Sequence, residues 1–260
     1  MARVLGESGR YVTHQAVEKR RQITTAAMIL IGASCALLGF CAGFSIRVDK
    51  FSLASSSVIL VLTVAVVWLG VGFSERKLAE LEKQRVNMRK AAVGEAAVGV
   101  CLADFPDDFY VINDLTTPFG NLDHVVVGPT GVFIIDTKSW RGVVAADGKG
   151  ELLLNGKPTQ KREIGGFVGR LMGIKERVKT LSRCDLYFQG VFAFTSARID
   201  ANWGTTASVH CLRDDQLFDY IVNGNSRKRL NKSDIDATAQ AFLALARMDK
   251  GFEQSSANAA

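Results

Sequence analysis

Two long uncharged stretches stand near the start of the chain, and short apolar runs separated by polar residues follow them. Residues 23–46 and 51–74 contain no Asp, Glu, Lys or Arg. At a rise of about 1.5 Å per residue, each stretch is long enough as a helix to cross a hydrocarbon core of about 30 Å. The pattern therefore predicts two transmembrane helices joined by the short link 47–50.

Two other structures are compatible with uncharged stretches near an N-terminus. A signal peptide fits the first stretch poorly, because its apolar run is too long and a second span follows directly. A buried helical hairpin in a soluble core is the other alternative, although adjacent uncharged runs of this length are rare in soluble domains. We therefore favour a membrane hairpin that contacts the lipid bilayer through residues 23–74.

The distribution of charge indicates how such a hairpin is oriented. The net charge is +6, yet residues 91–260 carry nineteen Lys and Arg against twenty acidic residues. Five basic residues precede residue 23 and six lie within 75–90, against two in the link. The positive-inside rule then places both termini in the cytoplasm, at the inner membrane. Five cysteines without paired or metal-binding spacing suit that reducing compartment.

The segments on either side of the hairpin are polar. Residues 1–22 predict a basic, cytoplasmic N-terminal tail, and residues 75–91 predict a charged helical linker. Leu78, Leu81 and Met88 recur in the linker at helical spacing, with Arg85 completing the stripe. The linker is then either a solvated helix or a short coiled coil that joins two subunits through residues 75–92. The arginine in the stripe favours the solvated helix.

The remainder predicts an α/β domain over residues 92–250 and a disordered tail over residues 251–260. Small and apolar residues around Gly94-Glu95 predict its first helix. Further strands are expected at 110–115, 122–127, 132–137, 143–144, 152–154, 191–194 and 209–212. Helices are expected at 159–182, 215–222 and 233–248, with Ser233 and Asp236 placed like a capping box at the start of the last one.

The strands 122–127 and 132–137 flank the turn-forming residues 128–131 and predict a β-hairpin. Because side chains alternate across a strand, Asp136 and Lys138 share the face of Val132 and Ile134. Asp123 shares a face with the valines of the partner strand and can lie near them. A D-x-K tripeptide alone is weak evidence for a catalytic site, because strand ends tolerate polar residues. The second acid, Asp123, makes this evidence stronger. His124 points to the opposite face, where a structural or incidental role is expected.

Asp123, Asp136-Thr137-Lys138, Trp140 and Gly142 resemble the core of the NERD (nuclease-related domain) family, a branch of the PD-(D/E)xK nuclease-like superfamily. The resemblance extends upstream to Gly94-Glu95. Downstream, Lys157-Pro158-Thr159-Gln160 resembles the family's Asn-Pro-x-x-Gln segment, with Lys157 in place of Asn. The resemblance covers about residues 92 to 215. It implies a restriction-endonuclease-like mixed β-sheet flanked by helices.

The resemblance also implies a site. Its catalytic set comprises Asp123, Asp136, Lys138, Glu95 and Gln160. Carboxylates on adjacent strands, with no His or Cys to complete the shell, favour Mg²⁺ or Mn²⁺. The candidate metal ligands are Asp123, Asp136, Glu95 and the carbonyl of Thr137, whereas Lys138 is expected to orient or help deprotonate a bound water.

The expected function is that of a membrane-anchored, metal-dependent nuclease hydrolysing phosphodiester bonds of nucleic acid, with DNA the favoured substrate. The predicted basic helix around 157–183 carries eight Lys and Arg against two acids. Such a run is commonly solvated surface, but beside this site it could contact the phosphate backbone. The alternative is a non-catalytic, membrane-anchored nucleic-acid-binding or scaffold protein with the same fold. A transporter is disfavoured, because uncharged spans offer no pathway.

Overall fold

The structure is a computed structural model. It describes residues 1–6, 53–159, 161–200, 209–224 and 229–257, together with positions 17–18, 21–22, 24–25, 28–29, 32, 36 and 39. The chain divides into two compact units. The first comprises Met1–Tyr11 and Lys90–Ala260, and the second comprises Val12–Arg89. Gln160 and most of the first expected span lie outside the described residues.

One long helix, α2 (Leu53–Ala103), contains residues 53–74 of the second expected span and the linker 75–91. The linker is therefore helical, as the sequence predicts, and it continues without a break into the first helix of the α/β domain. Within the part of the chain that the structure describes, no helix is both long and apolar enough to cross a membrane.

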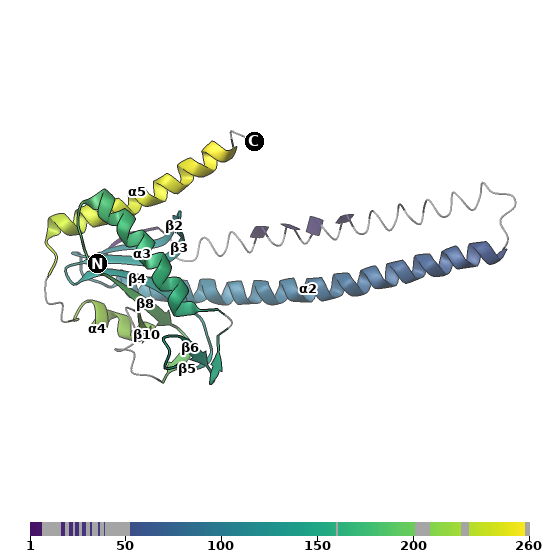
Figure 1. The fold of residues 1–260 in the computed structure, drawn as a ribbon, viewed down its shortest axis with the longest axis horizontal. Helices are drawn as coiled ribbons and strands as arrows, with labels where there is room; N and C mark the ends of the chain where they lie inside the picture. Colours follow the sequence, from purple (N-terminus) through teal and green to yellow (C-terminus); the bar gives the residue numbers. More distant parts are fainter. Residues whose placement is uncertain are drawn as a thin grey trace. The chain divides into compact units, whose positions relative to one another are not determined.

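A mixed six-stranded sheet forms the centre of the first unit (Figure 1). β2, β3 and β4 are antiparallel neighbours, whereas β4, β8 and β10 run parallel and β1 runs parallel to β2. This mixed α/β sheet agrees with the fold that the sequence predicts. The strand order is β1 (Arg3–Leu5), β2 (Tyr110–Thr117), β3 (Gly120–Gly128), β4 (Gly131–Lys138), β8 (Phe188–Phe194) and β10 (Val209–Arg213).

Helices cover both faces of this sheet. On one face, α3 (Glu163–Ser182) and α5 (Lys232–Ala257) enclose a large core that includes Phe167, Phe192 and Phe242. On the other face, the last turns of α2 and the short α4 (Leu217–Ile221) pack on Val126 and Ile135. The apolar alternation of β3 and β4 thus contributes to a core on each side, which fixes the register of the hairpin.

A second, smaller sheet follows the hairpin. Its strands are β5 (Gly142–Ala146), β6 (Leu152–Leu154), β7 (Lys157–Pro158) and β9 (Ala197–Ile199). Glu151, in the turn before β6, accepts hydrogen bonds from the backbone N–H groups of Ile164 and Gly165 at 3.1 and 2.9 Å. This carboxylate caps α3, so the helix begins at Glu163 and not at Thr159 as predicted. The basic stretch 157–183 therefore starts in a strand.

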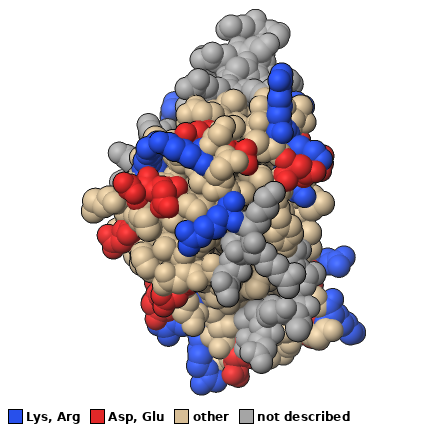
Figure 2. Space-filling model, turned by 90° about the vertical axis from the view of Figure 1, so that its left-hand side faces the viewer, with Lys and Arg blue, Asp and Glu red and all other residues tan. Residues whose placement is uncertain are grey.

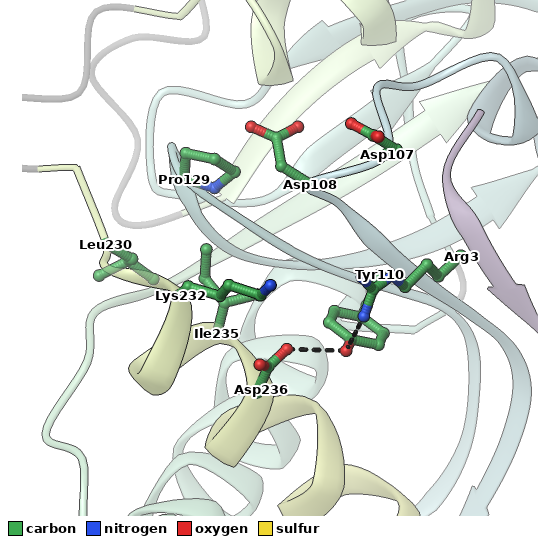
Figure 3. A pocket seen from close by; sticks show the side chains of 9 residues that line it. All are labelled: Arg3, Asp107, Asp108, Tyr110, Pro129, Leu230, Lys232, Ile235 and Asp236. Carbon is green, nitrogen blue, oxygen red and sulfur yellow. Dashed lines mark hydrogen bonds between the residues drawn. The ribbon is translucent and has the colours of Figure 1, made fainter.

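The N-terminus belongs to the sheet, whereas the sequence predicts only a polar tail there. Arg3 Nη1 donates to the Tyr110 hydroxyl at 2.6 Å, and that hydroxyl donates to Asp236 Oδ1 at 2.7 Å (Figure 3). These three side chains border a cavity of about 340 Å³. The chain of hydrogen bonds joins β1, β2 and α5. A three-residue strand is too short to show alternation in the sequence.

The last helix differs from its prediction at both ends. Asn231 Oδ1 accepts the backbone N–H of Asp234 at 2.8 Å, so Asn231 caps α5 in place of the expected Ser233. Asp236, the expected partner in that box, contacts Tyr110 instead. α5 also continues to Ala257, through most of the tail that was predicted to be disordered.

Candidate active site

The acid and the lysine at the end of β4 lie side by side, as the strand alternation predicts. Lys138 Nζ is 2.8 Å from Asp136 Oδ2, and both side chains are more than four-fifths buried. Lys138 Nζ also lies 5.0 Å from the ring centre of Phe192 and 5.8 Å from that of Trp140. The ammonium is therefore held in place by a carboxylate and by two aromatic rings.

Asp123 on β3 reaches the same end of the hairpin. Its Oδ2 accepts a hydrogen bond from the Thr137 backbone N–H at 2.7 Å. The regular pairing of β3 and β4 stops at His124 and Ile135, immediately before this bond. The Asp123 carboxylate thus takes the place of a strand partner and lies beside the D-x-K segment.

The alternation along β3 is not continuous up to Asp123, which the sequence did not indicate. Leu122 and Val125 both contact the same core, although strict alternation would put them on opposite faces. The neighbouring strand is distorted at the same level, because Asp114 has a φ of +53°. A left-handed residue interrupts the pleat and changes which face the next side chains occupy.

Glu95 approaches from the other layer. It lies in the last turns of α2 and is only 5 % exposed. Gly94 allows this approach, since a Cβ there would lie 2.9 Å from Ser139 Oγ and 3.2 Å from Thr195 Oγ1. The glycine lets the helix backbone pack against the residues that follow β4 and β8, so Glu95 comes within electrostatic reach of Asp136.

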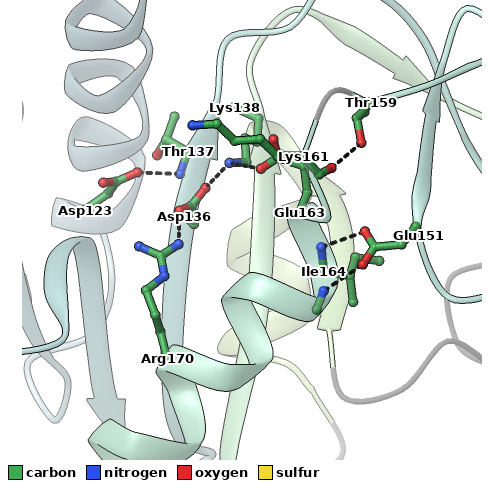
Figure 4. Close-up of polar contacts among 11 residues, drawn as sticks. Asp123, Asp136, Thr137, Lys138, Glu151, Thr159, Lys161, Glu163, Ile164 and Arg170 are labelled. Atoms are coloured by element: carbon green, nitrogen blue, oxygen red, sulfur yellow. Dashed lines mark hydrogen bonds and ion pairs between the residues drawn. The ribbon is translucent and has the colours of Figure 1, made fainter.

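Two residues of α3 complete the group (Figure 4). Glu163 Oε2 lies 3.0 Å from Lys138 Nζ, and Arg170 Nη2 lies 3.4 Å from Asp136 Oδ1. Both were missed in the sequence. Their spacing of seven residues puts them on one helical face, but only the packing of α3 on the sheet brings that face to β4.

Burial and neighbouring carboxylates shift the pKa of Glu95 and of Asp123. Burial, with Asp114 and Asp136 nearby, raises the pKa of Glu95 to about 7. Burial, Asp136 and Glu95 raise the pKa of Asp123 well above its usual value. Burial opposes the charged form of Lys138, yet the carboxylates of Asp136 and Glu163 raise its pKa, so the ammonium stays charged.

His124 has the structural role that the sequence predicts. It is fully buried, and its Nδ1 lies 2.8 Å from Asn113 Oδ1. Burial lowers its pKa to about 4, so the ring is neutral at physiological pH. A neutral imidazole enclosed in this way has no access to a substrate.

The donor chemistry of the site suits a hard divalent cation. Its acids are carboxylates from α2, β3 and β4, and the buried Thr137 Oγ1 has no hydrogen-bond partner within the described residues. In the described part of the chain, no three His, Cys, Asp or Glu side chains converge closely enough to form a ready metal shell. Both carboxylate oxygens of Asp136 form ion pairs, Oδ2 with Lys138 and Oδ1 with Arg170. The residue types therefore fit, whereas their present arrangement is an ion-pair network.

Comparison with known families agrees with this geometry. Residues 90–195 match the family model described as NERD, the nuclease-related domain. This stretch is a NERD domain. No curated protein and no solved structure gives a significant match. The match suggests a nuclease-related function, and it contains Glu95, the hairpin, Glu163 and Arg170.

Parts of the sheet lie outside the NERD domain. β1, β10 and α5 belong to the same compact unit but precede or follow the matched residues. The core and the sheet edge thus depend on sequence beyond the domain. A fragment beginning at residue 91 would lack β1.

The basic stretch 157–183 is partly neutralised. Lys175 and Lys179 both pair with Asp185, at 3.9 and 2.7 Å, and Arg162 lies 3.7 Å from Glu151. On the face drawn in Figure 2, basic and acidic side chains are interspersed and form no continuous basic field. Within the stretch 157–183, these ion pairs offset part of the positive charge, while Arg177 is exposed.

Proposed function

We propose that this chain is a membrane-anchored, metal-dependent nuclease that hydrolyses phosphodiester bonds of nucleic acid, with DNA the favoured substrate. The observation that carries the proposal is that Glu95 and Asp123, both with a raised pKa, lie near Asp136 and Lys138 within the stretch that matches the NERD family. The negative charge of Asp136 contributes to the raised pKa of both Glu95 and Asp123, and a bound cation would relieve this repulsion.

The cation proposed for this site is Mg²⁺ or Mn²⁺. Asp123 and Asp136 would hold it, with Glu95 and the carbonyl of Thr137 as further ligands. When bound, such an ion stabilises charge on a phosphate and lowers the pKa of a coordinated water.

Lys138 is assigned the role of a charged donor. Its raised pKa keeps the ammonium protonated, so it would orient a water by donating a hydrogen bond and offset negative charge in the transition state. The other role that the sequence left open, deprotonation of that water, would require Lys138 to lose its own proton first.

Substrate binding is proposed to involve exposed basic side chains of α3 and the segment before it. Phosphate contacts are sequence-independent and position a nucleic acid without reading its bases. Arg177 is the clearest such candidate on the surface of α3.

Anchoring is proposed through residues 23–46 and 51–74, with both termini cytoplasmic. The pairing of β1 with β2 supports this topology, because residues 3–5 and 110–112 share one sheet. Strands of one sheet lie on the same side of a bilayer, so any crossings between Leu5 and Tyr110 are even in number. Protease accessibility of both termini in sealed vesicles tests this.

The activity is tested with the full chain in detergent, so that β1 is retained. Plasmid, linear and single-stranded DNA and RNA are incubated with Mg²⁺, Mn²⁺ or EDTA. We expect metal-dependent cleavage that Asp136→Ala abolishes. Cleavage that continues in EDTA, or in the Asp136→Ala variant, would contradict the proposal.

A non-catalytic nucleic-acid-binding protein is the second candidate. The observation that favours it is the engagement of both Asp136 oxygens by Lys138 and Arg170. A folded chain that binds nucleic acid and metal without cleaving any substrate would support this candidate.

A further inference from the structure

Asp136 lies between two cations that are held very differently. Lys138 Nζ is 2.8 Å from Asp136 Oδ2 and has a second carboxylate, Glu163, at 3.0 Å. Arg170 Nη2 is 3.4 Å from Asp136 Oδ1 and is the more exposed of the two, at 39 % against 16 %. Its other neighbours among the described residues are the ring of Phe167, 5.8 Å from its guanidinium carbon, and Gly120, on which a Cβ would lie 3.9 Å from Arg170 Nη1. Lys138 is thus held by two carboxylates, whereas Arg170 pairs with one and is the easier of the two for another cation to displace.

We propose that Arg170 is a phosphate-binding residue of this site, and that a divalent cation competes with it for the Asp136 carboxylate. Cation binding then transfers the guanidinium from Asp136 to a phosphate of the nucleic acid. This inference rests on the proposed function, because it requires a cation on Asp136 and a nucleic acid beside it.

The charge balance explains the exchange. Lys138 is shared between Asp136 and Glu163, and Arg170 supplies the additional positive charge at Asp136 (Figure 4). A dication on the same carboxylate would place two further positive charges within a few ångströms of the guanidinium. Unlike charges favour contact at this range and like charges oppose it, most strongly where water is partly excluded. Arg170, having lost its acid, would leave.

The released guanidinium suits a phosphate. Its planar fork donates two parallel hydrogen bonds to phosphate oxygens, which an ammonium cannot reproduce. Arg170 is anchored on a helix whose first turn is fixed by Glu151, so the side chain can move while the backbone stays. Its partner would be a phosphate next to the cation, within the length of one arginine side chain.

The test measures cation and nucleic acid separately on the full chain. Mn²⁺ affinity is measured by the electron paramagnetic resonance of free Mn²⁺, without nucleic acid. Affinity for a fluorescein-labelled oligonucleotide is measured by anisotropy in Ca²⁺ and again in EDTA. We expect Arg170→Ala to bind Mn²⁺ about tenfold more tightly, because the competing charge is gone. The same variant is expected to bind the oligonucleotide about tenfold more weakly in Ca²⁺, with little change in EDTA.

Two variants complete the comparison. Arg170→Lys keeps the charge but not the fork, so its Mn²⁺ affinity should stay near that of the wild type while oligonucleotide binding in Ca²⁺ weakens. Arg177→Ala, on the same helix but away from Asp136, should weaken oligonucleotide binding equally in Ca²⁺ and EDTA and leave Mn²⁺ affinity unchanged.

Failure of the exchange and failure of the site give different results. If Asp136→Ala abolishes Mn²⁺ binding but Arg170→Ala leaves it unchanged, the exchange is wrong and the metal site stands. If Arg170→Ala weakens oligonucleotide binding equally in Ca²⁺ and EDTA, the exchange is again overturned. If Asp136→Ala binds Mn²⁺ like the wild type, the metal site of the proposed function fails, and this inference fails with it.

Discussion

The two halves of the candidate site carry their charge differently. Glu95 is buried and Asp123 is partly buried, and within the described residues no ion pair joins either of them to a basic side chain. Asp136 and Glu163 share Lys138, and Asp136 has Arg170 as well. We call the first half strained, because burial and neighbouring acids raise the pKa of its carboxyls, and the second half balanced, because its two acids have two basic partners.

This difference assigns separate tasks to residues that a motif would treat as one set. The uncompensated acids would attract a cation, and the balanced group would hold the lysine in position before the cation arrives. Arg170 pairs with Asp136 in the second half, and in our proposal it is the cation that this half releases. The first three predictions below each alter one half and leave the other intact, and the last one alters neither.

The largest effect is expected when the balanced half loses its central charge. Lys138→Ala leaves Asp136 and Glu163 without their shared ammonium and removes the proposed donor. Cleavage of plasmid in Mg²⁺ should fall by about 10²- to 10³-fold. Lys149→Ala, an exposed lysine in the turn before β6, is the control and should cleave like the wild type. Equal activity of the two variants would remove Lys138 from the mechanism.

The strained half is tested by its pH dependence in EDTA. Because the pKa of Glu95 is raised from 4.5 to about 7, the folded state holds a proton more tightly than the unfolded state does. The free energy of unfolding therefore falls as pH rises between these values, and it stays low above them. Glu95→Gln removes this loss. At pH 8 we expect the variant to be about 2 kcal/mol more stable than the wild type, allowing for solvent screening.

Urea unfolding followed by tryptophan fluorescence at pH 4, 6 and 8 measures this difference. The two proteins should be equally stable at pH 4 and diverge as the pH rises. Parallel stability profiles would mean that Glu95 is not strained, and the contrast between the two halves would disappear.

The sequence predicted the balanced half better than the strained one. Alternation along β4 is enough to put Asp136 beside Lys138, because both lie on one regular strand. The position of Asp123 could not be predicted from alternation alone. The φ of +53° at Asp114 and the shift between Leu122 and Val125 interrupt the regular alternation of side chains. The alternation of side chains along a strand can be predicted from local sequence, whereas the position at which two paired strands are distorted cannot.

Long-range partners were the other omission. Glu163 and Arg170 read as surface charges of a helix, and only the packing of α3 on the sheet turns them toward β4. Likewise, Arg3–Leu5 is too short to predict as a strand, and its partner lies more than a hundred residues away. In both cases the interaction depends on tertiary packing, so no local sequence pattern predicts it.

Within the balanced half, Lys138 pairs with both Asp136 and Glu163, and the contribution of Glu163 can be tested separately. Glu163→Gln keeps the shape of the side chain and one acceptor but removes its charge, so the pKa of Lys138 should fall. We expect cleavage to decrease about tenfold, the size of one charge-assisted hydrogen bond. Mn²⁺ affinity should change little, because Glu163 is not a proposed ligand. A variant that loses Mn²⁺ binding instead would make Glu163 part of the strained half.

The smallest effect is expected outside both halves, at the sheet edge. Tyr110→Phe removes the hydroxyl that accepts from Arg3 and donates to Asp236, while the ring remains. Because this contact is only partly buried, water can replace it, and the loss should be about 1 kcal/mol in urea unfolding. Cleavage and Mn²⁺ affinity should stay at wild-type values, since Tyr110 touches neither half. A loss of Mn²⁺ affinity would instead mean that β1 and α5 help to set the geometry of the acids, and the two halves could no longer be treated as a local unit.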